Sequence, residues 1–210
     1  IDSMTAPVDI VHVVSPAKIN LRLEILHKRP DGYHEIQTIF QKVSLHDDIT
    51  ISRVLQDGIS ITVDDPLVPS DESNLAYKAA ALVLRDQRIS SGLAISIKKR
   101  IPAGAGLGGG SSNAAATLLG LNRLFDLQLP VDRLQRFARQ LGADVPFFIE
   151  PSGTALATGI GEVLTPLRLH NPFWALIVFP NIGISTGWAY AEYSKDNLLT
   201  KKEKNIMLKN

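Results

Sequence analysis

The feature that most constrains this chain is a glycine-rich stretch at residues 102–115. Five glycines fall within residues 104–110, and Ser111, Ser112 and a run of helix-forming residues follow them. Glycine has no Cβ, so its backbone can bend sharply and come close to a ligand. Residues 93–98 alternate like a strand, and apolar residues from Ala114 to Phe125 recur at helical spacing. Because free N–H groups at a helix N-terminus attract anions, this strand–loop–helix order predicts a nucleotide phosphate cradle.

Three other interpretations of the loop are weaker. Gly104, Gly106 and Gly109 satisfy G-x-G-x-x-G, but a dinucleotide site expects an acidic residue at the end of the next strand, about 20 residues on. Asp126 is near that distance and closes a helical stretch instead. A Walker loop ends in Gly-Lys-Ser/Thr, and this loop has no lysine there. A merely flexible or tight-packing loop is disfavoured, because clustered glycines lower stability.

Three separately placed motifs resemble those of the GHMP small-molecule kinases. The first is the loop itself, Pro-x-Gly-x-Gly-Leu-Gly-Gly-Gly-Ser-Ser-Asn-Ala-Ala. The second combines Pro16-Ala17-Lys18-Ile19-Asn20-Leu21 with Asp31-Gly32-Tyr33-His34, and the third is Leu141-Gly142-Ala143-Asp144-Val145-Pro146. The resemblance covers roughly residues 12–190, and it implies an ATP-dependent kinase that phosphorylates a hydroxyl of a cytidyl diphosphate sugar alcohol.

The resemblance also implies a fold. Strands and helices are interspersed without strict alternation, which favours the α+β class. The family has two domains. We expect its ribosomal-protein-like, ATP-binding N-terminal domain at residues 4–158 and the start of its C-terminal domain at residues 159–210. Family members carry a late glycine-rich motif that nothing after Tyr190 matches. We therefore expect the C-terminal domain to be incomplete, the parent protein to extend beyond Asn210, and this chain to turn over poorly.

The family implies an ATP site formed by the loop and by three residues beside the adenine. Mg²⁺ is expected to bridge the phosphates; Ser111 is a suggested ligand, and its protein ligands are otherwise unknown. The expected nucleotide-binding residues are Pro102, Ala103, Gly104, Ala105, Gly106, Leu107, Gly108, Gly109, Gly110, Ser111, Ser112, Asn74, Leu75 and Lys99.

The family implies that Lys18 and Asp144 serve the accepting hydroxyl, with Asp144 as general base. Lys18 would keep Asp144 ionised, since a nearby opposite charge favours the anion. Asn20 would orient the acceptor. On the residues alone, Lys18 could instead be an ordinary solvated strand lysine, and Asp144 a turn or cap aspartate.

For the cytosine, the family implies stacking on Tyr33 and edge recognition by His34. Tyr190 is expected to close the sandwich from the other side, with Trp188 as the fallback. The alternatives without ligand binding are that His34 is a surface turn histidine and that Tyr190 packs its helix onto the sheet.

Composition excludes several classes of protein. The chain has no cysteine, which removes disulfides and thiolate metal sites, and its net charge of +1 gives no reason to expect nucleic acid. Its longest apolar run is too short to span a bilayer, and no secretory signal opens it. We expect a soluble cytoplasmic protein with a small-molecule substrate and neither a nucleic-acid nor a membrane partner.

Two alternatives stay open: a GHMP kinase for another small alcohol of the homoserine or mevalonate type, or a non-catalytic nucleotide- or RNA-binding module. The Asp31–His34 motif argues against the first, and the lack of a basic stripe argues against RNA.

Several local expectations concern the rest of the chain. Ser73 is expected to cap a helix from Asn74 to about Arg88, and Pro130 to open another. Two hairpins are expected, 49–55 with 59–63 and 153–158 with 163–167, and a buried strand at residues 174–179. Pro146 biases Val145 toward an extended backbone.

Overall fold

The computed structural model describes residues 9–184, 188–189 and 192–193. Strands and helices are interspersed along the chain, which confirms the α+β class. The strands are β1 (Ile10–Lys28), β2 (His34–Val54), β3 (Ile59–Val63), β4 (Gly92–Lys98), β5 (Thr154–Thr158) and β6 (Val163–Leu167). The helices are α1 (Leu75–Gln87), α2 (Gly109–Leu124), α3 (Val131–Leu141) and α4 (Val145–Ile149).

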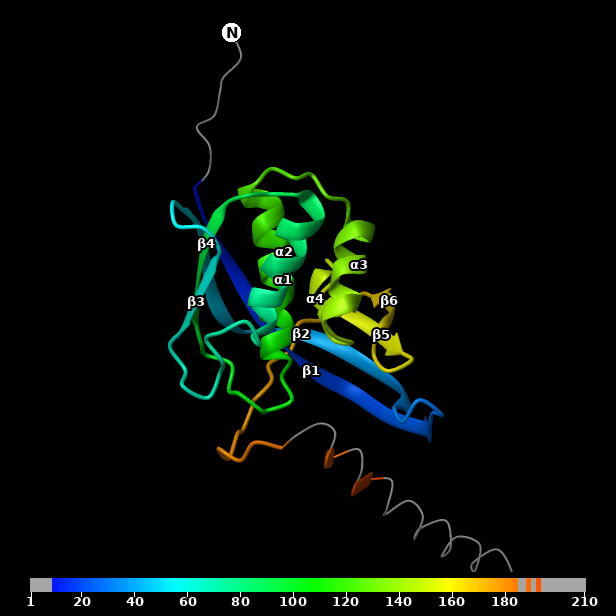
Figure 1. Cartoon of the computed structure of the whole chain (residues 1–210). Helices are drawn as coiled ribbons and strands as arrows, with labels where there is room; N and C mark the ends of the chain where they lie inside the picture. Colours follow the sequence, from blue (N-terminus) through cyan, green and yellow to red (C-terminus); the bar gives the residue numbers. More distant parts are fainter. Residues whose placement is uncertain (1–8, 185–187, 190–191, 194–210) are drawn as a thin grey trace, which may run out of the picture.

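All six strands form one sheet in the order β3-β4-β2-β5-β6, with β1 paired to β2 alone. The helices gather against this sheet, with α2 next to β1 and β2 (Figure 1). Ile49 and Ile51 of β2 and Leu118 and Leu121 of α2 are at most 1% exposed. Burying a Leu or Ile side chain contributes about 1.5–3 kcal/mol, so this layer fixes the position of α2 and of the loop before it.

The β1–β2 hairpin is long and irregular. Its register shifts at Pro16/Lys18, at Asn20/Arg22 and at Ile25/His27. Such bulges bend a strand and re-aim its side chains. The outer part of the hairpin projects from the body, and Leu23 and Leu26 are about half exposed there (Figure 1).

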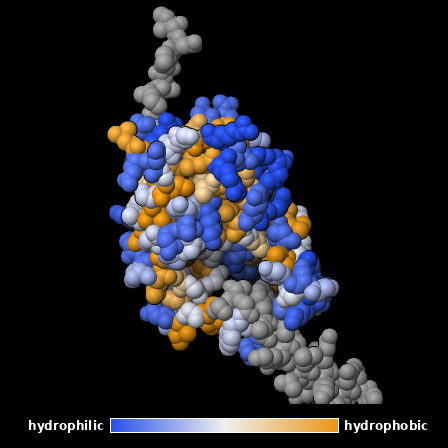
Figure 2. Space-filling view, in the orientation of Figure 1, coloured by the Kyte–Doolittle hydropathy of each residue, from blue (hydrophilic) through white to orange (hydrophobic). Residues whose placement is uncertain are grey.

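Helix α3 is amphipathic, as its sequence predicts. Leu134, Phe137 and Ala138 face the core, while Arg136 and Arg139 are exposed. Hydrophilic side chains accordingly gather over this helix (Figure 2). Among the described residues, no helix is both long enough and apolar enough to cross a membrane.

Four local predictions are wrong. Strand β3 runs parallel to β4 and does not form a hairpin with β2, because β4 lies between them. The N-cap of α1 is Asn74 rather than Ser73. Val145 opens the short helix α4, since proline is tolerated in a first helical turn. Residues 174–179 form no strand, and Trp174, Leu176 and Val178 are largely exposed.

The hairpin of β5 and β6 is present as predicted. It joins the same sheet as the preceding strands, although we expected a domain boundary at residue 158. That boundary stays a prediction.

Candidate active site

The glycine loop leads directly into α2. Gly108 is the N-cap of α2 and has a φ of 72°, a left-handed conformation that side chains rarely adopt. A Cβ on Gly108 would lie 2.9 Å from the ring of Phe148 and 3.1 Å from Cγ of Lys18. No acidic residue occupies the first turn of α2. Its free N–H groups therefore face the loop without a competing negative charge, which suits phosphate.

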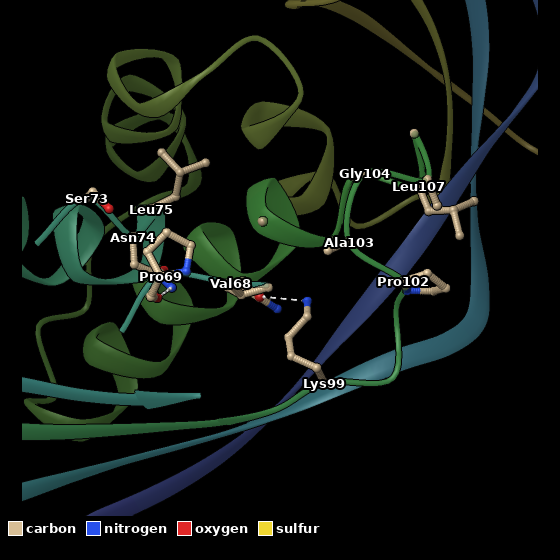
Figure 3. Close-up of a pocket in the computed structure, with 16 residues that line it drawn as sticks. Val68, Pro69, Ser73, Asn74, Leu75, Lys99, Pro102, Ala103, Gly104 and Leu107 are labelled. Carbon is tan, nitrogen blue, oxygen red and sulfur yellow. Dashed lines mark hydrogen bonds between the residues drawn. The ribbon is translucent and has the colours of Figure 1, made fainter. Parts of the chain in front are cut away.

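A pocket of about 280 Å³ opens over this loop. Residues 102–110 form one wall, and Val68, Pro69, Ser73, Asn74 and Leu75 form the other (Figure 3). The Lys99 side chain reaches up between the two walls (Figure 3). The structure thus brings the expected phosphate loop and the three expected adenine-side residues to one cavity, although Asn74 and Leu75 lie more than twenty residues before Lys99 and the loop.

Two of these residues have other partners as well. The Asn74 side chain accepts a hydrogen bond from the backbone N–H of Ala76 and donates one to the carbonyl of Pro69, so it holds the pocket wall in place. The Lys99 ammonium pairs with the buried carboxylate of Asp47 and donates to the Asn113 side chain at 3.3 Å.

Asp47 is a residue that our sequence reasoning missed. Its side chain is fully buried, and one carboxylate oxygen accepts from the backbone N–H groups of Arg100 and Ile101, at 2.7 and 2.9 Å. The other accepts from Lys99 and from Asn113 in the first turns of α2. Asp47 therefore ties the start of the glycine loop to its end. A signal was present in the sequence, because the period-two pattern of Ile49 and Ile51 puts Asp47 on the same buried face.

A second link runs from this network to β1. The Asn113 amide donates to the hydroxyl of Ser15 at 2.9 Å, and Ser15 donates to the hydroxyl of Ser112 at 2.8 Å. The Ser112 hydroxyl is thus used inside the protein. Ser111 is half-buried, and its hydroxyl has no hydrogen-bond partner within the part of the chain that the structure describes.

Lys18 and Asp144 come together beside the end of the loop. The Lys18 ammonium lies 3.8 Å from the Asp144 carboxylate and donates to the Asn20 side chain at 2.8 Å. Asn20 in turn donates to the hydroxyl of Thr38 at 2.7 Å. Burial lowers the pKa of the Lys18 ammonium, and the charge of Asp144 opposes that shift. The alternation of polar and apolar residues from Ala17 to Ile25 predicts that Lys18 and Asn20 share one face of the strand, and the hydrogen bond between them agrees with this.

Asp144 sits where α3 gives way to α4. It is the N-cap residue of α4, but its side chain makes no capping hydrogen bond and is 33% exposed. A Cβ on Gly161, in the turn between β5 and β6, would lie 3.6 Å from its carboxylate. The carboxylate is therefore accessible from solvent and lies between Lys18 and this turn.

The structure does not bring Tyr33 and His34 to Lys18. They lie at the tip of the β1–β2 hairpin, where His34 pairs with Lys28. Ten residue steps of β1 and eight of β2 separate the Lys18–Lys42 pair from the Lys28–His34 pair, and the bulges bend the hairpin between them. The tip is held by Arg29, which bridges Asp31 and Glu35, and Tyr33 is 60% exposed.

The second aromatic side of the expected cytosine site is not described. Tyr190 lies outside the described residues. The fallback, Trp188, is described and 58% exposed. The described residues also contain no cluster of three His, Cys, Asp or Glu side chains that could hold a metal ion.

Comparison with known proteins identifies the family. The family model for the GHMP kinases N terminal domain matches residues 74–150, from the cap of α1 through Asp144 to the end of α4. A relative from Acetivibrio thermocellus is 42% identical over 193 residues, which is 92% of this chain and 68% of that protein. The chain belongs to the GHMP kinase family. That relative and one from Geobacillus sp., 46% identical over 89% of this chain, both carry the name 4-diphosphocytidyl-2-C-methyl-D-erythritol kinase.

A solved structure agrees with these relatives. The crystal structure of 4-(cytidine 5'-diphospho)-2C-methyl-D-erythritol kinase matches with a TM-score of 0.66 and 44% identity, over 76% of this chain and 56% of that one. The Geobacillus relative is matched over 64% of its length. The chain thus spans between 56% and 68% of the length of these three proteins.

Proposed function

We propose that this protein is the phosphoryl-transfer part of a kinase that uses ATP to phosphorylate the 2-hydroxyl of 4-diphosphocytidyl-2-C-methyl-D-erythritol, in the non-mevalonate route to isoprenoids. We expect it to act in the cytoplasm. The observation that carries the proposal is the Lys18–Asp144 pair, 3.8 Å apart and adjoining Gly108 at the mouth of the phosphate loop. A base and a cation beside a phosphate cradle are what phosphoryl transfer to an alcohol requires.

Each residue then has a defined task. Asp144 accepts the proton of the attacking hydroxyl. Lys18 pairs with that carboxylate and stabilises the negative charge that develops on the alkoxide. Asn20, fixed by Thr38, orients the hydroxyl by hydrogen bonding. The N–H groups of the loop and of the first turn of α2 hold the phosphates of ATP in line with it.

The residues present fit Mg²⁺ bound mainly through phosphate. The Ser111 hydroxyl stands in the first turn of α2 and has no protein partner in the described residues, whereas Ser112 has one. Mg²⁺ usually takes few protein ligands and several phosphate and water oxygens, which agrees with the absence of an acidic cluster in the described residues. When bound, Mg²⁺ would neutralise phosphate charge.

A path for an extended substrate leads from the base to the hairpin tip. Gly161 adjoins Asp144, and two residues back the N–H of Gly159 donates to Glu35 at 3.0 Å. Glu35 follows His34 directly. A sugar alcohol at Asp144 joined through a diphosphate to a cytosine near Tyr33 and His34 would lie along this turn.

The test is an ATP-turnover assay with three alcohols: the cytidyl substrate, homoserine and mevalonate. We expect phosphorylation of the cytidyl substrate alone. Turnover of homoserine or mevalonate would instead make the protein a kinase for another small alcohol. ATP binding without turnover of any of the three would favour a non-catalytic nucleotide-binding module. Binding of ATP and of CDP is measured in parallel by calorimetry, because it reports on the two sites without needing catalysis.

A further inference from the structure

A second lysine, half-buried, lies directly across from Lys18. Lys18 of β1 and Lys42 of β2 are Cα partners in the antiparallel register, so their side chains leave the same face of the sheet. Both ammonium groups lie over the same aromatic cluster. Lys18 is 4.6 Å from the ring centroid of Phe40 and Lys42 is 5.5 Å from that of Phe147, and those two rings are 5.1 Å apart.

Lys42 contacts the opposite end of α4 from Lys18. Its ammonium donates to the carbonyl of Phe148 at 3.1 Å and to the carbonyl of Glu150 at 2.6 Å. Phe148 is in the last turn of α4 and Glu150 is its C-cap residue, and carbonyls at a helix end lack partners within the helix and carry partial negative charge. Lys18 holds the Asp144 carboxylate at the start of the same helix. One turn of helix therefore lies between two lysines that stand on neighbouring strands.

We propose that Lys42 is a positioning residue for the catalytic pair: it clamps the carboxyl end of α4 so that the Asp144 carboxylate is held at Lys18. The helix has only five residues, so fixing its last carbonyls fixes its N-cap. Phe148 extends the contact to the phosphate loop, since its ring lies 2.9 Å from the position that a Cβ on Gly108 would take. This role rests on the proposed function only in that the pair it positions is the catalytic one.

The energetics favour positioning over stabilisation. Burial lowers the pKa of Lys42 to about 8, and the charge of Glu150 only partly opposes this shift. The other charged group facing Lys42 from the neighbouring strand is Lys18, which carries the same sign. The folded protein thus holds the Lys42 charge at a cost, and an apolar side chain of similar length avoids that cost. A residue kept only for stability would not show this pattern.

The experiment is a double-mutant cycle read by NMR. The pKa of Lys18 is measured in protein labelled with ¹³C at lysine Cε. Four proteins are compared: the parent, Asp144→Asn, Lys42→Met, and the double variant that carries both changes. With Lys42 present, Asp144→Asn is expected to lower the Lys18 pKa, because it removes the opposing charge. In Lys42→Met that shift is expected to fall to less than half. Lys42→Arg, which keeps the donors, is expected to restore most of it, and Lys98→Met at an exposed position is the matched control.

The outcomes separate the two proposals. An equal shift in the Lys42 and Lys42→Met proteins overturns the clamp. If Lys42→Met does not fold, Lys42→Gln takes its place in the same cycle. In turnover assays, Lys42→Met is expected to lower kcat about tenfold or more, as small misplacements do, with both KM values within twofold. A protein that phosphorylates none of the alcohols but keeps the NMR coupling refutes the proposed function and leaves the clamp standing.

Discussion

The backbone N–H of Lys18 donates a 2.9 Å hydrogen bond to the carbonyl of Leu107. This bond fastens the strand that carries the proposed catalytic lysine to the glycine loop. The Ser15–Ser112 contact makes a second connection between the same two segments. The expected acceptor site and the expected phosphate site are therefore parts of one rigid unit, which is the geometry that in-line transfer needs.

Replacing the base should remove activity and leave the fold intact. Asp144→Asn is expected to lower kcat by about 10²–10⁴-fold, the usual worth of a general base. The protein should stay folded with a modest fall in melting temperature, because Asp144 makes no capping hydrogen bond and Lys18, which loses a counter-charge, keeps its hydrogen bond to Asn20. Asp57→Asn in an exposed turn is the control. Near-parent turnover in Asp144→Asn would reassign the base.

The loop can be tested with two glycines of similar backbone conformation. Gly106 has φ of 71° and Gly58 has φ of 94°, and a Cβ on either would meet no atom within 4 Å. Alanine at each should cost stability, about 1–3 kcal/mol for a strained backbone. Only Gly106→Ala should also lower the affinity for ATP, because Gly106 lines the pocket and the added Cβ would block close approach of a phosphate. Calorimetry with ATP and with CDP measures this, and equal ATP affinity in both variants would make the loop purely structural.

Two adjacent aspartates test the network under the loop. Asp47 is fully buried with Lys99, whereas the Asp48 side chain is 39% exposed. Asp47→Asn is expected to lower the free energy of unfolding by about 3–5 kcal/mol, since it leaves a buried ammonium without its counter-charge. Asp48→Asn should cost at most about 1 kcal/mol. Urea denaturation decides, and similar losses would contradict the assignment.

Lys42 gives stability a pH dependence of known sign. The pKa of an ordinary lysine is 10.5, and burial lowers the pKa of Lys42 to about 8 in the folded protein. Between these two pH values the unfolded chain binds more protons than the folded protein. The contribution of Lys42 to the free energy of unfolding should therefore increase as pH rises from 8 toward 10.5. Urea titrations across this range, compared with Lys42→Met, isolate the effect. A parent protein whose stability falls relative to Lys42→Met over that range would contradict the burial of this charge.

The hairpin tip is expected to recognise the cytosine. Tyr33→Ala should lower the affinity for CDP by about 5–150-fold, which corresponds to about 1–3 kcal/mol of stacking, and should leave the affinity for ATP nearly unchanged. Because Tyr33 is 60% exposed, the melting temperature should not change. His34→Ala should in addition narrow the preference for cytidyl over uridyl ligands. Unchanged CDP binding in Tyr33→Ala would place the base elsewhere.

The sequence alone determined the family, and it predicted the glycine loop before α2 and the proximity of Lys18 and Asp144, because these features depend on local motifs. A glycine cluster before a helix has few uses other than close approach to a ligand, and alternation alone puts Lys18 and Asn20 on one face of a strand. The same local rules located α3 and the β5–β6 hairpin, whose apolar periods are uninterrupted.

Only the tertiary structure decided which distant residues meet. Ile49 and Ile59 lie in consecutive strands, yet β4 inserts between them, because strand order is set by packing rather than by sequence distance. The register shift at Pro16/Lys18 cannot be seen in a strict period of two, and it lies directly before the lysine that contacts Phe40 and Asp144. Asp47 meets Lys99 and Asn113, and Lys42 meets Phe148, through contacts between segments more than fifty residues apart. No local pattern encodes such contacts, because each depends on where the whole sheet places its neighbours.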